Sequence, residues 1–265
     1  MVQTDVKVIQ PNEDIQLGYA ALTLLDDLGI EAIGPEPDAF GLLVDRYGID
    51  FPDTRELSQF ARNTLDNIDP LVSPDHALVA WMDHEQALFH YMERHIVKTR
   101  LQNGFAGGND AIDVDGFFKF ATSVVNRRKS RAGSALGHHV EAVLNAHGVR
   151  YVREARTENS KRPDFLFPGQ AEYNNLAYPS AMLTMLGAKR TCKDRWRQVL
   201  SEANRIVNKH LLTLEPSISI PQTNEMRAAN LQLVVPHHLF ASYQPEQRDW
   251  LMDVAGFIEL VKSKR

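Results

Sequence analysis

The sequence contains a single cysteine and no long hydrophobic run. Cys192 has no partner for a disulfide within the chain and cannot make a cysteine-based zinc site, which is typical of proteins from a reducing compartment. No stretch approaches the ~18 consecutive apolar residues of a membrane-spanning helix. The first residues also lack the basic start and apolar core of a secretory signal. We therefore expect a cytoplasmic protein that does not bind membranes.

The composition is that of an ordinary globular protein, but its charge is unevenly distributed. The 265 residues, 43% of them hydrophobic, suffice for one large domain with an appendage. Residues 121–210 hold 16 basic and 7 acidic side chains, whereas the rest of the chain holds 13 and 27, so the net charge of −5 conceals a positive central third. Such a basic face favours nucleic acid as a partner. The alternative is a chance fluctuation of solvated charge.

Hydrophobic spacing predicts helices first and strands later. Helical patterns cover residues 16–28, 56–64, 76–101, 114–125 and 134–146, with a basic run between the last two. Strand patterns follow at 149–152, 164–167, 182–188 and 231–235, and helical patterns at 194–211 and 245–261. This order predicts an α/β core, in which helices flank a sheet, with a helical N-terminal appendage.

Three charged residues lie where the edge of a sheet would bring them together. Asp164 begins an apolar strand, Lys189 directly follows another, and Glu202 is expected in the helix after it. Two carboxylates and an ammonium group suit metal-dependent phosphodiester hydrolysis: the carboxylates hold Mg²⁺, which activates a water, and the lysine orients or deprotonates that water. A salt-bridged surface cluster is the alternative, since this spacing alone is common.

Basic segments flank these three residues. Residues 189–197, with the sequence KRTCKDRWR, contain five lysines and arginines, and residues 126–133 contain four more. Contacts from such side chains to phosphates position a protein on nucleic acid, and bidentate contacts to guanine read sequence. A carboxylate site set within basic segments is what a nuclease requires, because its substrate is a polyanion.

From about residue 56 to the C-terminus, the chain resembles the catalytic domain of EcoRII-type restriction endonucleases. The segments that carry the resemblance are SVVNRRKSRAG (123–133), KRPDFLFP (161–168), MLGAKRTCKDRWRQVLSEA (185–203), QTNEM (222–226) and LQLVVP (231–236). The resemblance implies a helical appendage over residues 1–55 and a PD-(D/E)xK catalytic domain over residues 56–265, with a restriction-endonuclease-like mixed β-sheet core flanked by helices.

The same resemblance implies an activity and partners. They are Mg²⁺-dependent cleavage of double-stranded DNA by a homodimer, at a short site of the CCNGG or CCWGG type whose central base pair is flipped out of the stack. A cognate DNA methyltransferase is expected in the same restriction–modification system. About fifty residues precede the matching region, too few for the effector domain of longer members, so one DNA site per dimer is expected to suffice.

The resemblance also assigns the site residues. The expected catalytic residues are Asp164, Lys189, Glu202, Tyr173 and Arg195, and the expected metal ligands are Asp164, Glu202 and Glu141. For DNA binding, the resemblance implies Arg127, Arg128, Lys129, Ser130 and Arg131. The basic segment 189–197 adds Arg190, Lys193 and Arg197 as expected DNA-binding residues.

One position departs from the family pattern. Gly137 stands where the family has a glutamate that supports the metal site. Glu141, one helical turn further on, or His138 is a candidate replacement. Alternatively the site is weakened, which leaves open a catalytically weakened, sequence-specific DNA-binding protein of the same fold. A repair nickase that acts on mismatches is a further alternative.

Overall fold

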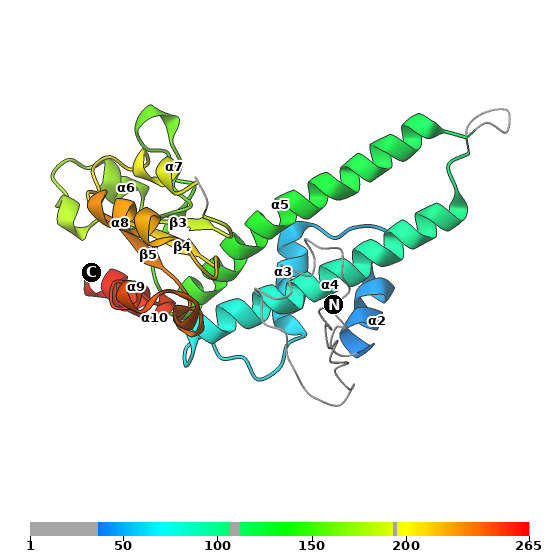
Figure 1. The fold of residues 1–265 in the computed structure, drawn as a ribbon, viewed down its shortest axis with the longest axis horizontal. Coiled ribbons are helices and arrows are strands. Elements are labelled where there is room, and N and C mark those ends of the chain that lie inside the picture. Colours follow the sequence, from blue (N-terminus) through cyan, green and yellow to red (C-terminus); the bar gives the residue numbers. More distant parts are fainter. Residues whose placement is uncertain (1–36, 107–111, 193–194, 265) are drawn as a thin grey trace, which may run out of the picture. The chain divides into compact units, whose positions relative to one another are not determined.

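The computed structural model describes residues 37–106, 112–192 and 195–264 (Figure 1). The helix predicted over residues 16–28 lies outside them. Helices come first, as predicted: α2 (Pro37–Tyr47), α3 (Thr54–Asn63), α4 (Pro74–Asn103) and α5 (Val114–Ala146). In this part of the chain, no helix is both long and apolar enough to cross a membrane.

The first three helices share a core of their own. The side chain of Asp53 caps α3 by accepting a hydrogen bond from the Arg55 amide at 2.8 Å. Buried Leu43 of α2, Phe60 of α3 and Phe89 of α4 belong to one hydrophobic cluster. Residues from 37 onward therefore pack with the long helix α4, although helix α2 was not predicted.

Helix α5 is one continuous helix, whereas the sequence pattern predicted two helices separated by a basic run. The run continues the helix because arginine, lysine and serine carry no backbone penalty comparable to that of glycine or proline. Helix α4 also supplies acidic partners to this run, with Glu93 contacting Arg128 at 2.5 Å and Glu85 contacting Arg131 at 3.6 Å. The prediction of a break within the helix was wrong.

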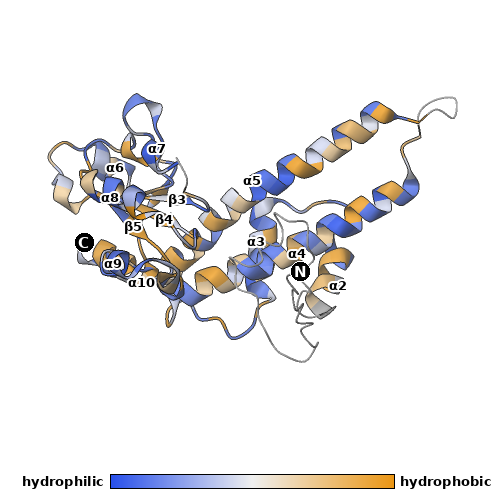
Figure 2. Ribbon diagram, in the orientation of Figure 1, coloured by the Kyte–Doolittle hydropathy of each residue, from blue (hydrophilic) through white to orange (hydrophobic). Residues whose placement is uncertain are grey.

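The second half of the chain forms a mixed five-stranded sheet, which confirms the predicted fold class. The strands are β1 (Val152–Arg153), β2 (Phe165–Phe167), β3 (Thr184–Lys189), β4 (Lys209–Thr213) and β5 (Leu231–Val234), and they lie side by side in this order. Strands β1, β2 and β3 are antiparallel, whereas β3, β4 and β5 are parallel. The hydrophobic residues of β4 and β5 (orange in Figure 2) are buried, as is expected of strands covered on both faces.

The helix predicted over residues 194–211 is mostly absent. Helix α7 spans only Trp196–Leu200, and the chain then enters strand β4 at Lys209. Periodicity alone cannot distinguish a short buried strand from a buried helix segment, and residues 209–211, which begin β4, were assigned to the helix for this reason. Glu202 consequently lies two residues beyond the end of α7 rather than inside a helix.

The remaining elements are short. The helix predicted over 245–261 is divided into α9 (Pro245–Arg248) and α10 (Val254–Ser263), because Asp253 caps α10 by accepting from the Gly256 amide at 2.7 Å. The rest are α6 (Gln170–Asn174), α8 (Ile220–Ala228) and the 3₁₀ turns η2 (Glu158–Ser160), η3 (Ser180–Met182) and η5 (His237–Ser242). Helix α8 was not predicted.

A buried carboxylate joins the helical layer to the C-terminus. Asp75, in the first turn of α4, accepts hydrogen bonds from the amides of His237, Val254 and Ala255 at 2.9–3.1 Å. Burial raises the pKa of Asp75 despite these three bonds. The start of α4 is thereby fastened to α10.

Candidate active site at the edge of the sheet

Asp164 and Lys189 meet at the end of strand β3. Antiparallel pairing of Phe165 with Leu186 brings the residue before β2 next to the last residues of β3. Lys189 Nζ donates to Asp164 Oδ2 at 2.7 Å, and the Ala188 amide donates to the same oxygen at 2.7 Å. The structure thus brings together two of the predicted catalytic residues, and the sheet itself orients the carboxylate.

Glu202 is the third member of this site. It is only 9% exposed, and its Oε2 atom is buried and accepts no hydrogen bond from the described residues. Burial raises the pKa of Glu202 to about 7, while the charge of Lys189 opposes this shift and that of Asp164 adds to it. A buried carboxylate oxygen without a donor, next to a second carboxylate, is chemically suited to hold a hard divalent cation such as Mg²⁺.

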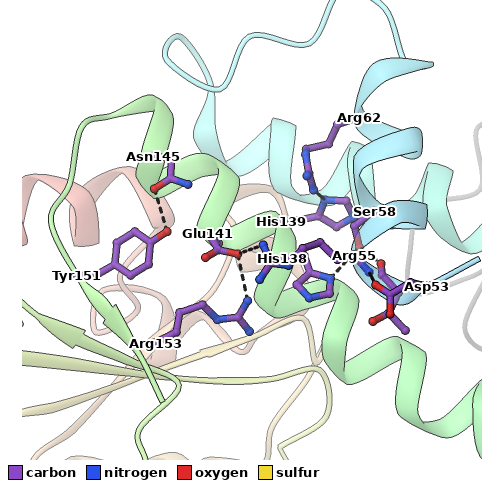
Figure 3. Close-up of polar contacts among 11 residues, drawn as sticks. Asp53, Arg55, Ser58, Arg62, His138, His139, Glu141, Asn145, Tyr151 and Arg153 are labelled. Carbon is purple, nitrogen blue, oxygen red and sulfur yellow. Dashed lines mark hydrogen bonds and ion pairs between the residues drawn. The ribbon is translucent and has the colours of Figure 1, made fainter. Parts of the chain in front are cut away.

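Glu141, the third expected metal ligand, is instead held by two arginines (Figure 3). Its Oε2 accepts from Arg55 Nη1 at 2.8 Å and from Arg153 Nη1 at 3.1 Å. Burial would raise the pKa of Glu141, but the hydrogen bond from Arg55 and the charge of Arg153 lower it below its usual value. Within residues 37–106, 112–192 and 195–264, no three His, Cys, Asp or Glu side chains gather closely enough to hold a metal ion.

The surroundings of Gly137 match this arrangement. A Cβ atom at this position would lie 2.7 Å from Arg153 Nη2, so the guanidinium occupies the space into which a side chain would project. The neighbouring His138 places its Nδ1 3.1 Å from the Ser58 hydroxyl of α3 (Figure 3). In place of a carboxylate, this turn of α5 therefore faces an arginine.

Tyr173 and Arg195, the other two expected catalytic residues, lie in different surroundings. Tyr173 is 3% exposed, and its hydroxyl donates to the Glu158 carboxylate at 2.6 Å and accepts from the Arg205 amide at 3.4 Å. Arg195 is exposed immediately before α7. Tyr173 thus contacts the backbone that follows Glu202. The catalytic roles of both residues stay predictions.

The basic segment of α5 contains exposed and buried side chains. Arg127, Arg128, Lys129 and Ser130 are exposed, and Arg128 is held by the buried carboxylate of Glu93 through Nε at 3.1 Å and Nη2 at 2.5 Å. Arg131 is 3% exposed, because it pairs with Glu85 and lies 4.4 Å from the centre of the Phe89 ring. The four exposed side chains are accessible to a binding partner, whereas Arg131 is not, and their role as DNA contacts stays a prediction.

The other expected DNA-binding residues belong to the second basic segment, residues 189–197. Arg190 donates to Gln86 of α4 at 3.4 Å. Arg197 pairs with Glu225 at 2.6 Å and lies over the Trp196 ring. Lys193 falls outside the described residues. The role of each as a DNA contact stays a prediction.

Sequence reasoning missed Lys209. This lysine is 6% exposed, and its Nζ donates to three backbone carbonyls in the segment that carries Glu202. The available signal was a lysine shortly before Leu211 and Leu212, but the chain up to residue 211 had been assigned to a helix.

The chain is similar in sequence to known restriction enzymes. The sequence profile described as EcoRII C terminal matches residues 89–258, a range that includes Asp164, Lys189 and Glu202. The Type II restriction enzyme EcoRII of Escherichia coli is 39% identical over 223 residues, which are 82% of this chain and 52% of that protein. The chain belongs to the EcoRII C-terminal family. This member spans about half the length of EcoRII.

Two solved structures share the fold of this EcoRII C-terminal family member. Metal-depleted Ecl18kI in complex with uncleaved, modified DNA has a TM-score of 0.65 at 18% identity, over 85% of this chain and 83% of that one. The restriction endonuclease PspGI–substrate DNA complex has a TM-score of 0.59 at 15% identity, over 88% and 93% of the two chains. These similarities confirm the predicted restriction-endonuclease-like fold.

Proposed function

We propose that this chain is a site-specific deoxyribonuclease that hydrolyses double-stranded DNA with Mg²⁺ at a short site of the CCNGG or CCWGG type. The observation that carries the proposal is the contact of Lys189 Nζ with Asp164 Oδ2 at 2.7 Å. Beside this pair lies the buried carboxylate of Glu202, whose Oε2 accepts no hydrogen bond from the described residues. Membership of the EcoRII C-terminal family supports it, since EcoRII is a Type II restriction enzyme.

Each residue of the site has a role that follows from its surroundings. Asp164 and Glu202 would hold Mg²⁺, which when bound lowers the pKa of a water and offsets charge on the scissile phosphate. The Ala188 amide fixes one oxygen of Asp164, so the orientation of this carboxylate does not depend on a flexible loop. Lys189 presents Nζ at the same edge, where its ammonium form can orient the attacking water or contact the phosphate, and its neutral amine form can take a proton from that water.

The expected partners follow from the surface and from the family. The exposed residues 127–130 of α5 would contact the recognition sequence, with Glu93 orienting the Arg128 guanidinium. A homodimer would read the two halves of a palindrome-like site with the same residues and flip its central base pair. A host that carries such an enzyme needs a cognate DNA methyltransferase to protect its own sites.

Digestion of a mapped plasmid with Mg²⁺, followed by sequencing of the ends, tests the proposal. We expect discrete fragments with one common end sequence, and no cutting by Lys189→Ala. Lys262→Ala, which removes a lysine from the exposed Glu259 pair on α10, is the matched control and should cut normally. A uniform smear of products, or cutting that survives Lys189→Ala, would contradict the proposal.

A sequence-specific DNA-binding protein without cleavage is the second candidate. Its support is the arginine that faces Gly137 and the pairing of Glu141 with Arg55 and Arg153, which leave the site with two acidic residues. A footprint on one DNA site that persists in Mg²⁺ and never becomes a strand break would favour it. In that case Gly137→Glu, which restores a carboxylate at this position, should produce cutting at the footprinted site.

A further inference from the structure

The segment that follows Glu202 is fastened through its amides. Three consecutive amide nitrogens donate outward: Ala203 to Thr157 Oγ1 at 3.4 Å, Asn204 to Glu158 Oε2 at 3.1 Å and Arg205 to Tyr173 Oη at 3.4 Å. Ala203 has a φ of 48°, in the left-handed region that residues with a side chain rarely adopt. Contacts outside the segment therefore maintain its conformation.

Three carbonyls of the same segment accept hydrogen bonds from one lysine. Lys209, the first residue of β4, directs Nζ at the carbonyl oxygens of Glu202 at 2.5 Å, Ala203 at 3.0 Å and Ile206 at 3.0 Å. A lysine ammonium group has three protons, so these three bonds use all of them. The backbone of Lys209 is in turn part of the sheet, because its amide donates to Asn230 at 3.0 Å and it pairs with Leu231.

This geometry leaves the Glu202 side chain available. The Lys209 ammonium is committed to main-chain oxygens, and Glu202 Oε2 accepts no hydrogen bond from the described part of the chain. A lysine that bonded the carboxylate directly would neutralise it and compete with a cation. A lysine that bonds the carbonyl of the same residue restrains the carboxylate without occupying it.

We propose that Lys209 is a positioning residue, whose ammonium group locks residues 202–206 so that the Glu202 carboxylate is held beside Asp164 and Lys189 for a divalent cation. The inference rests on the proposed function, in which Glu202 is a metal ligand. Removal of a group that orients a metal ligand typically changes metal affinity about ten- to a hundredfold. We expect a change of this size when the Lys209 ammonium group, which holds the backbone of the ligand Glu202, is removed.

The test measures Mn²⁺ binding by calorimetry on the full chain bound to an uncleavable duplex, alongside DNA binding in EDTA. Lys209→Met should weaken Mn²⁺ binding about ten- to a hundredfold and leave DNA binding in EDTA within about twofold of the parent protein. Lys264→Met is the matched control, because this lysine likewise donates to a main-chain carbonyl, that of Leu183, and to Thr184 Oγ1, at the opposite end of β3. It should leave Mn²⁺ affinity unchanged.

Folded Lys209→Met with the Mn²⁺ affinity of the parent protein would overturn the inference. If Lys209→Met does not fold, Glu158→Ala decides, because Glu158 is only half-buried and holds the Asn204 amide of the same segment. This variant should weaken Mn²⁺ binding about tenfold, and an unchanged affinity would again overturn the inference. A parent protein that binds DNA but neither cleaves it nor binds Mn²⁺ would instead overturn the proposed function.

Discussion

Lys189 Nζ lies 2.7 Å from Asp164 Oδ2, although 25 residues separate the two in the sequence. The contact exists because β2 and β3 are antiparallel neighbours, so that the beginning of one meets the end of the other. The Ala188 amide holds the same carboxylate oxygen. The orientation of this pair is therefore a property of the sheet, and substitutions at either residue should act on the chemistry of the site more than on the fold.

Asp164→Ala should lower the rate of DNA cleavage about a hundredfold or more, and it should keep or strengthen DNA binding. The substitution removes a metal ligand and also a negative charge from a surface that approaches phosphates. Plasmid cleavage in Mg²⁺ and a mobility shift in EDTA measure the two effects. Glu225→Ala, which removes an exposed carboxylate paired with Arg197, is the control for charge alone. If Asp164→Ala also loses DNA binding, Asp164 is structural.

Arg128→Ala should cost about 1–3 kcal/mol of binding free energy on the cognate site and much less on unrelated DNA. The Glu93 carboxylate accepts hydrogen bonds from Nε and Nη2 of this guanidinium and so orients it for reading a base. Competition binding with cognate and scrambled duplexes measures the difference, and Lys129→Ala on the next position is the comparison. An equal loss of affinity on all sequences would identify Arg128 as a phosphate contact. In that case the slope of log affinity against log salt concentration should also decrease in magnitude by about 1.

Arg131→Ala should lower the free energy of unfolding by about 3–5 kcal/mol, because it leaves the fully buried Glu85 carboxylate without its arginine. Arg197→Ala, which breaks the half-exposed pair with Glu225, should cost at most about 1 kcal/mol. Urea unfolding measures both. Arg131→Ala with unchanged stability and weakened DNA binding would show that Arg131 leaves its buried site to contact DNA.

His210 should make the protein less stable in mild acid. Burial, together with the charge of Lys264, lowers the pKa of His210 to about 4, while the unfolded chain protonates near the usual value of 6.5. A folded-state pKa below the unfolded value means that the unfolded chain takes up the proton first as the pH falls. The stabilising effect is therefore present above pH 6.5 and is lost between 6.5 and 4.

The expected size of this effect is about 2 kcal/mol between pH 7 and pH 5. Urea unfolding at the two pH values measures it, and His210→Gln should reduce the difference between them by that amount. An identical pH dependence in the parent protein and in His210→Gln would show that this histidine is not the group responsible.

The local pattern of the sequence was enough to predict an α/β core with helices first and strands later, and most of the individual elements. Strand β2 and helix α4 were predicted nearly to their observed ends, because a proline and a hydrophobic pattern mark them within the segment itself. Strand β4 and the continuity of α5 were not. Whether residues 209–213 form a strand or a helix depends on the neighbouring strands β3 and β5. The basic run of α5 stays helical because it packs against acidic residues of α4.

For the site, residue types and their order in the chain indicated a nuclease, since an aspartate, a lysine and a glutamate within basic segments suit a metal and a polyanion, and the family resemblance named the same three. Their geometry needed the folded chain. Only the packed structure shows that Glu141 is neutralised by two arginines, that Arg131 is buried, and that Lys209 holds the backbone of Glu202. Hydrogen bonds and ion pairs act over a few ångströms between residues distant in sequence, so neither spacing nor composition contains them.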